Sequence, residues 1–275
     1  MKELCLIILA MSAYAGYIRV FNDDFNNLDN WNAVTETGHQ TGNNEWEYYR
    51  PENAYVGSTS HGQALTLKVK REDYGGYHYT SGKVESKKSY GPYGFFNIKA
   101  LVPKGNGLWP AIWLLPPGAR DEYGGWAACG EIDIMETVCT HSEGYSTLHF
   151  GGEYPKNVQY PTGGANRYPF GVDWSQPHSF GVEWQPSFMT FWFDAYVEDG
   201  VVKGTEIFKI DSYHWYSEKS DGQRWPGNAP FNLPFNIILN VAIGGNWPCS
   251  IGGCCDNVAV PNQMEVYNVQ IWEEA

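Results

Sequence analysis

The sequence of 275 residues lacks an apolar run of the roughly 18 residues that a bilayer-spanning helix requires. Basic charge is also scarce, because 18 Lys and Arg stand against 31 Asp and Glu and leave a formal net charge of −13. A surface of this sign repels phosphates and anionic lipids, so we expect neither nucleic acid nor a membrane as a partner. The chain has no Asn-x-Ser/Thr sequon, and N-glycosylation is not expected. Uncharged ligands are compatible with this charge.

Cysteine is rare, and the first of six lies in a segment with the features of a signal peptide. A lysine precedes the apolar run Leu4–Met11, and Ala13-Tyr14-Ala15 fits the small-x-small cleavage pattern. We expect residues 1–15 to be removed and Gly16 to begin a secreted, extracellular protein; a buried first strand is the alternative. Export permits disulfides among the five remaining cysteines, an odd number. A zinc cluster around Cys249–Cys255 is a weaker alternative, because no Cys-x-x-Cys pair or nearby histidine completes it.

Aromatic residues and turn formers are abundant instead: there are 12 Trp, 19 Tyr, 31 Gly and 16 Pro. No window has a long apolar stripe of helical period, whereas short segments such as 64–70 alternate apolar and polar residues. We expect an all-β fold, two stacked antiparallel sheets or a barrel, in a single domain over residues 16–275. The expected strands are Ala64–Lys70, Gly94–Val102, Trp109–Leu115, Glu131–Val138, Thr147–Phe150, His178–Trp184, Thr190–Asp194, Ile237–Ala242 and Met264–Trp272. Glu153–Asp173 and Ser212–Pro230 are predicted to be long surface loops.

Three acids lie within six residues in the segment Gly130–Glu136. On a regular strand Glu131 and Asp133 share a face, but Glu136 would point to the opposite, apolar face. An unpaired carboxylate buried there would be destabilising or would take up a proton. A one-residue bulge near Ile134–Met135 would return all three acids to one face, and we predict it there. A solvated acidic face or a Ca²⁺ site is the alternative interpretation of this spacing.

With the bulge, the two glutamates are four strand steps apart, about 13 Å between Cα atoms. Side chains that lean toward each other can close this distance to roughly the 5–5.5 Å of a retaining glycosidase pair. Such a pair needs one ionised carboxylate that attacks the anomeric carbon and one protonated carboxyl that protonates the leaving oxygen. The aspartate between them would hydrogen-bond one glutamate and help to hold their pKa values apart.

The pattern Glu-x-Asp-x-x-Glu at 131–136 resembles the signature of glycoside hydrolase family 16, in its bulged, laminarinase-like branch. Other matching segments occur in the family's order: Asn44-Glu45, Tyr48-Tyr49, Tyr79–Gly82, Tyr93-Gly94, Gly107–Trp113, Leu148–Gly151 and Asn240–Pro248. The resemblance implies a β-jelly-roll sandwich with a substrate cleft across its concave sheet, and cleavage of β-1,3-glucan with retention of configuration. It implies Glu131 as nucleophile, Asp133 as assisting acid and Glu136 as acid/base, with no required cofactor.

The candidate substrate-binding residues are Asn44, Trp109, Trp113, Trp126, His149 and Trp247. Trp109 and Trp113 lie four residues apart on one strand face and could stack on sugar rings; core packing is the alternative. In the family, the residue corresponding to His149 lies by the acid/base residue; a histidine satisfied by core hydrogen bonds is the alternative. For Asn44 the alternative is a turn position.

Several positions depart from the family pattern. The family often has Arg where Lys83 and Lys99 stand, and Glu where Asn97 stands, so subsite affinity or sheet-edge stability should differ. Many members bind Ca²⁺ on the convex face through an Asp of the last strand, where this sequence has Tyr267. Oxygens for a structural calcium could still come from Asp23, Asp24 and Glu265.

The cysteine spacing limits the possible disulfides. Cys129 and Cys139 are ten residues apart on the expected catalytic strand, about 30 Å if it is extended. A disulfide requires Cα atoms within roughly 7 Å, so these two should not pair. Adjacent cysteines pair only in a strained ring, which favours Cys249 bonded to Cys254 or Cys255, and Cys139 bonded to the other. Cys129 would remain a thiol at the cleft edge.

Two functions of different classes remain, and both have a polysaccharide as partner. One is a monomeric, secreted endo-β-1,3-glucanase, and the other is a non-catalytic β-glucan recognition protein on the same fold. Recognition proteins of this type typically lose one or both catalytic glutamates, and all three acids here favour the enzyme. An endo-β-1,3(4)-glucanase acting on mixed-linkage glucan is the alternative within the hydrolases. Galactan-specific members share the acids, so the acids do not select the sugar.

Overall fold

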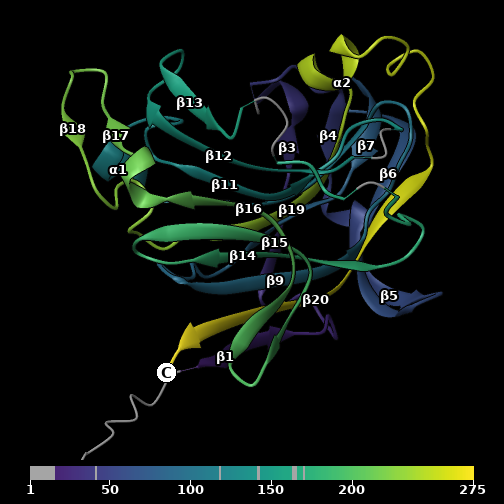
Figure 1. Cartoon of the computed structure of the whole chain (residues 1–275). Helices are drawn as coiled ribbons and strands as arrows, with labels where there is room; N and C mark the ends of the chain where they lie inside the picture. The colour runs from purple at the N-terminus through teal and green to yellow at the C-terminus, as the bar shows by residue number, and fades with distance from the viewer. Residues whose placement is uncertain (1–15, 41, 118, 141–142, 163–165, 170) are drawn as a thin grey trace, which may run out of the picture.

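The computed structural model describes residues 16–275 apart from 41, 118, 141–142, 163–165 and 170, so the predicted signal peptide at 1–15 lies outside it. Two sheets stack to form a sandwich (Figure 1). The strands of the first are β1 (Tyr17–Asp23), β3 (Glu36–Thr37), β4 (Glu47–Tyr49), β5 (Ala54–Thr59), β6 (Gly62–Tyr74), β7 (Tyr77–Ser81), β9 (Gly94–Leu101), β14 (His178–Trp184), β15 (Phe188–Glu198), β16 (Val201–Asp211) and β20 (Asn262–Glu274).

The strands of the second sheet are β2 (Trp31–Ala33), β8 (Lys83–Ser86), β10 (Leu108–Leu115), β11 (Glu131–Glu136), β12 (Tyr145–Gly152), β13 (Asn157–Tyr160), β17 (Ser217–Glu218), β18 (Arg224–Trp225) and β19 (Asn236–Ile243). Its strand order is β18-β17-β12-β11-β10-β19-β8-β2, with β13 paired to β12. The order in the first sheet is β16-β15-β14-β9-β20-β6-β7-β4-β3, with β1 on β20 and β5 on β6. The helices are α1 (Ala119–Tyr123), α2 (Asn246–Ser250) and the 3₁₀ turns η1 (Gly38–Gln40), η2 (Pro51–Asn53) and η3 (Ser212–His214).

The predicted all-β sandwich is confirmed, but its sheets are mixed rather than purely antiparallel. Strand β4 runs parallel to β7, and β12 runs parallel to β17. Both pairs join segments that are far apart in the chain, so no hairpin turn imposes the antiparallel direction on them.

All nine predicted strands are present, and the bounds of β14 coincide with the prediction. The prediction of two long loops without regular structure was wrong. The first segment contains β13, and the second contains η3, β17 and β18. These strands have two to four residues, too few to show a period of two. Their existence depends on the partner strand in the folded sheet.

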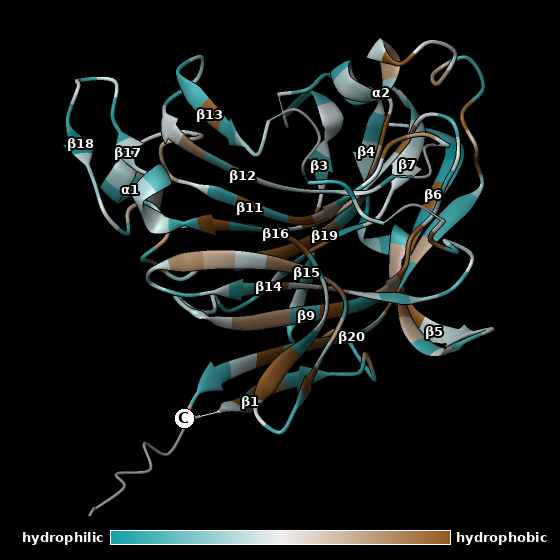
Figure 2. Ribbon diagram, viewed as in Figure 1, coloured by the Kyte–Doolittle hydropathy of each residue, from teal (hydrophilic) through white to brown (hydrophobic). Residues whose placement is uncertain are grey.

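The core lies between the two sheets, where alternate residues of each strand meet. From the first sheet β6 contributes Leu65, Leu67 and Val69, and from the second β10 contributes Ile112 and Leu114, all fully buried. Figure 2 shows hydrophobic segments along strands of both sheets. Because one face of each strand fills this core, the other face of the second sheet is left to form a site. None of the helices among the described residues is long and apolar enough to cross a membrane.

Candidate active site

A β-bulge in β11 orients the acidic residues, as the sequence predicts. Ile112 of β10 pairs with Met135, but the next residue, Trp113, pairs with Asp133. Ile134 is therefore the extra residue of the bulge, and it is fully buried in the core. The register with β12 also shifts at this point.

The bulge brings Glu131, Asp133 and Glu136 to the same side, where all three line a cleft of about 840 Å³. Strands β10, β19 and β8, on one side of β11 in the same sheet, supply much of the rest of its surface, together with the segment before β4. Other side chains that line the cleft are Tyr49, Lys83, Trp109, Trp113, Trp126, Tyr154 and Asn240. Three of the four predicted tryptophans therefore lie where a sugar chain could stack on them.

Each glutamate of the cluster accepts a hydrogen bond from an indole. The Trp126 N–H donates to Glu131 Oε2 over 3.1 Å, and the Trp109 N–H donates to Glu136 Oε1 over 2.9 Å. These donors hold the two carboxyl groups in fixed orientations. They also stabilise the ionised form of each.

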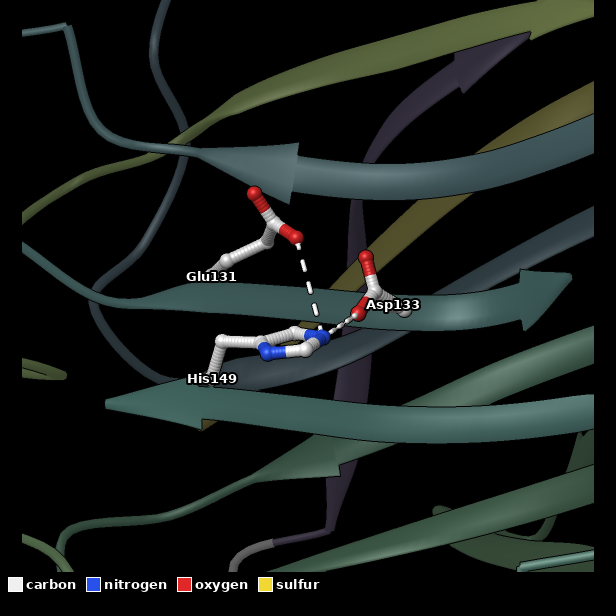
Figure 3. A group of neighbouring side chains, drawn as sticks. All are labelled: Glu131, Asp133 and His149. Carbon is white, nitrogen blue, oxygen red and sulfur yellow. Dashed lines mark ion pairs between the residues drawn. The ribbon is translucent and has the colours of Figure 1, made fainter. Parts of the chain in front are cut away.

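His149 lies beside Glu131 and Asp133, as Figure 3 shows. Its Nε2 is 3.3 Å from Asp133 Oδ2 and 4.0 Å from Glu131 Oε1. The cause is the strand register, because His149 on β12 is the direct partner of Glu131 on β11. An electrostatic interaction with His149 also acts to lower the pKa of Glu136, so the histidine interacts with the expected acid/base residue as well. The ring of Trp126 packs against the imidazole at a centroid distance of 5.3 Å.

Burial raises the pKa of all three carboxyl groups. It raises the pKa of Asp133 and of Glu136 to about 8, and that of Glu131 well above its usual range. The neighbouring charge of Asp133 adds to the rise in pKa at both glutamates, whereas the indole donors act in the opposite direction. The raised pKa of Glu136 favours a retained proton at neutral pH, which a general acid requires.

By distance alone, Glu131, Asp133 and His149 could hold a metal ion, since one ligand atom from each lies within 4.8 Å of the others. The Trp126 N–H, however, already points at the Glu131 carboxylate. That bond is made to Oε2, so a cation on Oε1, the oxygen that faces His149, would be opposed instead by the raised pKa of the carboxyl groups, because protonated carboxyls are poor metal ligands. We interpret the group as part of a proton-transfer site.

The residues considered for calcium do not fit that ion. Both carboxylate oxygens of Asp23 accept hydrogen bonds from N–H groups of the protein. Those of Glu265 accept hydrogen bonds from Gln263 and Tyr267, and Asp24 accepts one from a neighbouring asparagine. Calcium would have to displace these donors, and no step below involves it.

Three predicted binding residues, Asn44, His149 and Trp247, are not among the described residues that line the cleft. Asn44 is exposed in a left-handed turn, with φ of 59°, and its side-chain N–H donates to Asn246. Its neighbour Asn43 lines the cleft, as Asn246 does. Trp247 packs against Trp109 with ring centroids 5.2 Å apart.

Sequence reasoning named Lys83 as a departure from the family pattern but missed the polar cluster that this lysine forms at the β8 side of the cleft. Lys83 Nζ lies 2.6 Å from Glu36 Oε2 and faces the rings of Tyr49 and Trp113. Glu85 is two residues further along β8 and also lines the cleft. The signal in the sequence was the alternation in 83–86, where the polar residues Lys83 and Glu85 stand on either side of a buried valine. The other two departures, Lys99 and Asn97, lie on β9 of the opposite sheet.

The favoured disulfides are confirmed: Cys139 bonds to Cys254, and Cys249 bonds to Cys255. Cys129 is a thiol outside both bonds, but it is buried in a small apolar cluster with Tyr123 rather than placed at the cleft edge. The predicted continuous strand was too long, because β11 ends at Glu136 and contains neither Cys129 nor Cys139.

A β-sandwich with clustered carboxyl groups in an aromatic cleft has the site of a glycoside hydrolase. The chain belongs to glycosyl hydrolases family 16, whose family model matches residues 43–232.

The chain is 32% identical to "Glucan endo-1,3-beta-glucosidase A1" of Niallia circulans over 95% of its own length, and it spans 39% of that protein. It is 34% identical to the "Beta-glucanase" of Rhodothermus marinus, with 86% of this chain and 76% of that protein covered. The X-ray structure of the laminarinase from Rhodothermus marinus superimposes with a TM-score of 0.72 at 28% identity, covering 94% of this chain and 98% of that chain.

Proposed function

We propose that this protein is a retaining endo-β-1,3-glucanase. The observation that carries the proposal is the bulge in β11, which places Glu131, Asp133 and Glu136 together in the cleft. The names of the similar enzymes, glucan endo-1,3-beta-glucosidase and laminarinase, support β-1,3-glucan as the substrate.

The reaction proceeds in two displacements. In the first, the ionised Glu131 attacks the anomeric carbon, the glycosidic bond breaks, and Glu136 gives its proton to the departing oxygen. In the second, Glu136 removes a proton from water, the water oxygen attacks the anomeric carbon, and Glu131 leaves. His149 and the Trp126 N–H lie against Glu131 and favour its ionised form. Asp133 lies within the same cluster and links the charge states of the two glutamates.

Mixed-linkage β-1,3(4)-glucan is the second candidate substrate, because a similar solved structure, 28% identical to this chain, is named "a non-specific endo-beta-1,3(4)-glucanase". The cleft does not discriminate between the two glucans, since aromatic platforms accept either linkage. We also propose that the protein works outside the cell as a monomer. Its two disulfides suit an oxidising compartment.

Release of reducing sugar from laminarin, lichenan, agarose and carboxymethylcellulose tests the substrate. NMR of the first product should show the β-anomer if configuration is retained. Glu131→Gln and Glu136→Gln should each remove nearly all activity, whereas Gln substitution of the distant Glu206 should not. Azide should restore turnover of an aryl β-glycoside by Glu131→Ala and give the α-glycosyl azide, because azide occupies the place of the lost nucleophile. Wild-type protein that binds laminarin without cleaving it would favour the recognition protein instead.

A further inference from the structure

The cysteine-rich segment after β19 is tied to the catalytic strand. Cys139 follows Glu136 by three residues and is bonded to Cys254. The backbone N–H of Cys139 also donates to the carbonyl of Leu108, the first residue of β10, and the N–H of Gly107 points to Cys254 Sγ at 3.3 Å. This disulfide therefore joins the end of β11, the start of β10 and the loop that follows α2.

Trp247 of α2 continues this connection into the cleft. Its ring meets that of Trp109 edge-on, at 85° and 5.2 Å between centroids, and it meets Tyr145 at 5.6 Å. Both tryptophans pack on the buried cluster that contains Cys139 and Cys254. Trp109 in turn donates its indole N–H to Glu136. An unbroken series of contacts thus runs from the disulfide to one catalytic carboxyl group.

We propose that Trp247, anchored by the Cys139–Cys254 disulfide, is a positioning residue that fixes the Trp109 indole and thereby orients Glu136 for proton transfer. This inference rests on the proposed role of Glu136 as acid/base. Trp109 is only half-buried and lines an open cleft, so the cleft side cannot hold its ring in place. Trp247 and the disulfide supply the missing support.

The proposal predicts a defect that depends on the leaving group. A sugar leaving group needs a proton from Glu136, whereas 2,4-dinitrophenolate leaves without one. For Trp247→Ala, kcat/KM on laminarin should fall about tenfold, a fraction of the 10²–10⁴ that general acid catalysis contributes. On 2,4-dinitrophenyl β-laminaribioside it should change by less than about twofold, since that step bypasses the acid. Trp247→Phe keeps a ring in place and should restore most of the laminarin activity.

The pH profile gives a second readout. Loss of the Trp109 N–H bond raises the pKa of Glu136, because that bond favours the ionised carboxylate. The alkaline limb of kcat/KM on laminarin should therefore move to higher pH in Trp109→Phe. It should move in the same direction in Trp247→Ala and in the Cys139→Ser/Cys254→Ser double variant. Trp272→Ala is the matched control, because this half-buried tryptophan lies on β20 of the other sheet.

The outcomes separate the two levels of the argument. Wild-type protein that cleaves neither substrate would refute the proposed function, and the positioning role with it. Active wild type combined with equal losses on both substrates in Trp247→Ala, or with an unmoved alkaline limb, would refute the positioning role alone. If the cysteine double variant does not fold, as judged by thermal unfolding, Trp247→Ala and Trp247→Phe still decide the question.

Discussion

At the scale of single residues, the active site consists of carboxyl groups whose charge is disfavoured by burial and supported by a few donors. Glu131 and Glu136 each receive one indole N–H, and His149 lies between Glu131 and Asp133. Three acids in one cleft cannot all be ionised without strong mutual repulsion. Function therefore requires an arrangement that works against the stability of the folded chain.

Glu136→Gln should stabilise the protein against heat while it removes activity. Burial raises the pKa of Glu136 to about 8, so between its unfolded pKa of roughly 4.3 and about 8 the folded state binds more protons than the unfolded state. Stability conferred by the protonated group is present below that window and declines as pH rises through it. Glutamine does not ionise, so the Tm difference between variant and wild type should grow from pH 5 to pH 8.

Differential scanning calorimetry at several pH values measures this difference. Gln substitution of Glu206, an exposed residue on β16, is the control and should show no such trend. A Tm gain that is constant with pH would show that burial of the charge is not its cause.

Trp126→Phe should move the acidic limb of the kcat/KM profile to higher pH. The Trp126 N–H stabilises the ionised Glu131, so its removal raises the pKa of that carboxyl group and a higher pH is needed to ionise it. The phenyl ring keeps the packing against His149. Rates on an aryl glycoside across pH 4 to 9 check the shift, and an acidic limb that stays in place would exclude the role of this donor.

At the scale of elements, β11 performs two tasks with one extra residue. Ile132, Ile134 and Met135 fill the core, while Glu131, Asp133 and Glu136 face the cleft. In a regular strand of this sequence, the three apolar residues could not all face the core while the three acids all face the cleft. The neighbouring strands β10 and β12 both adapt their register to the bulge.

Insertion of one alanine after Met135 should abolish activity and strongly destabilise the fold. It would turn Glu136 toward the core, where an unpaired carboxyl group costs several kcal/mol. Deletion of Ile134 instead keeps alternation between the acids and the core residues, so some activity should survive with a stability loss of about 2–4 kcal/mol for one lost isoleucine. Urea unfolding and laminarin hydrolysis measure both effects.

An alanine inserted between Gly75 and Gly76, in the turn that joins β6 and β7, is the matched control for these changes. It should leave activity intact. Full activity of the Met135 insertion variant would contradict the assignment of Glu136 to the cleft face by the bulge.

At the scale of the whole molecule, the chain carries a net negative charge and acidic residues predominate in the cleft. The net charge is −13, and the cleft is lined by Glu36, Glu45 and Glu85 in addition to the three acids of β11. Among the described residues that line the cleft, Lys83 is the only basic one, and its ammonium group donates a hydrogen bond to Glu36. Such a cleft suits a neutral polysaccharide.

Carboxymethyl-laminarin should therefore be a poorer substrate than hydroxyethyl-laminarin, a neutral derivative of similar bulk. We expect kcat/KM to differ about tenfold at low salt and the gap to narrow toward 0.5 M NaCl, because exposed charges are screened over a Debye length of about 10 Å at 0.1 M salt. A gap that does not respond to salt would point to shape rather than charge.

The sequence by itself determined the fold class, the strand face on which the three acids lie and the residues that form the core. Those features follow from local periodicity: a strand alternates with a period of two, and Glu136 could reach the cleft only through a bulge. The spacing of the cysteines also limited the disulfides, because the bond has a short reach.

Only the tertiary structure decided which groups from distant parts of the chain meet. His149 faces Glu131 because of the β11–β12 register, and Lys83 reaches Glu36 from a strand 47 residues away. Trp247 packs against Trp109, and a disulfide between residues 115 positions apart ties the loop after α2 to the segment that follows β11. The short parallel strand β17 likewise exists through its partner β12. Register and long-range pairing are set by how whole sheets pack, and local periodicity does not encode them.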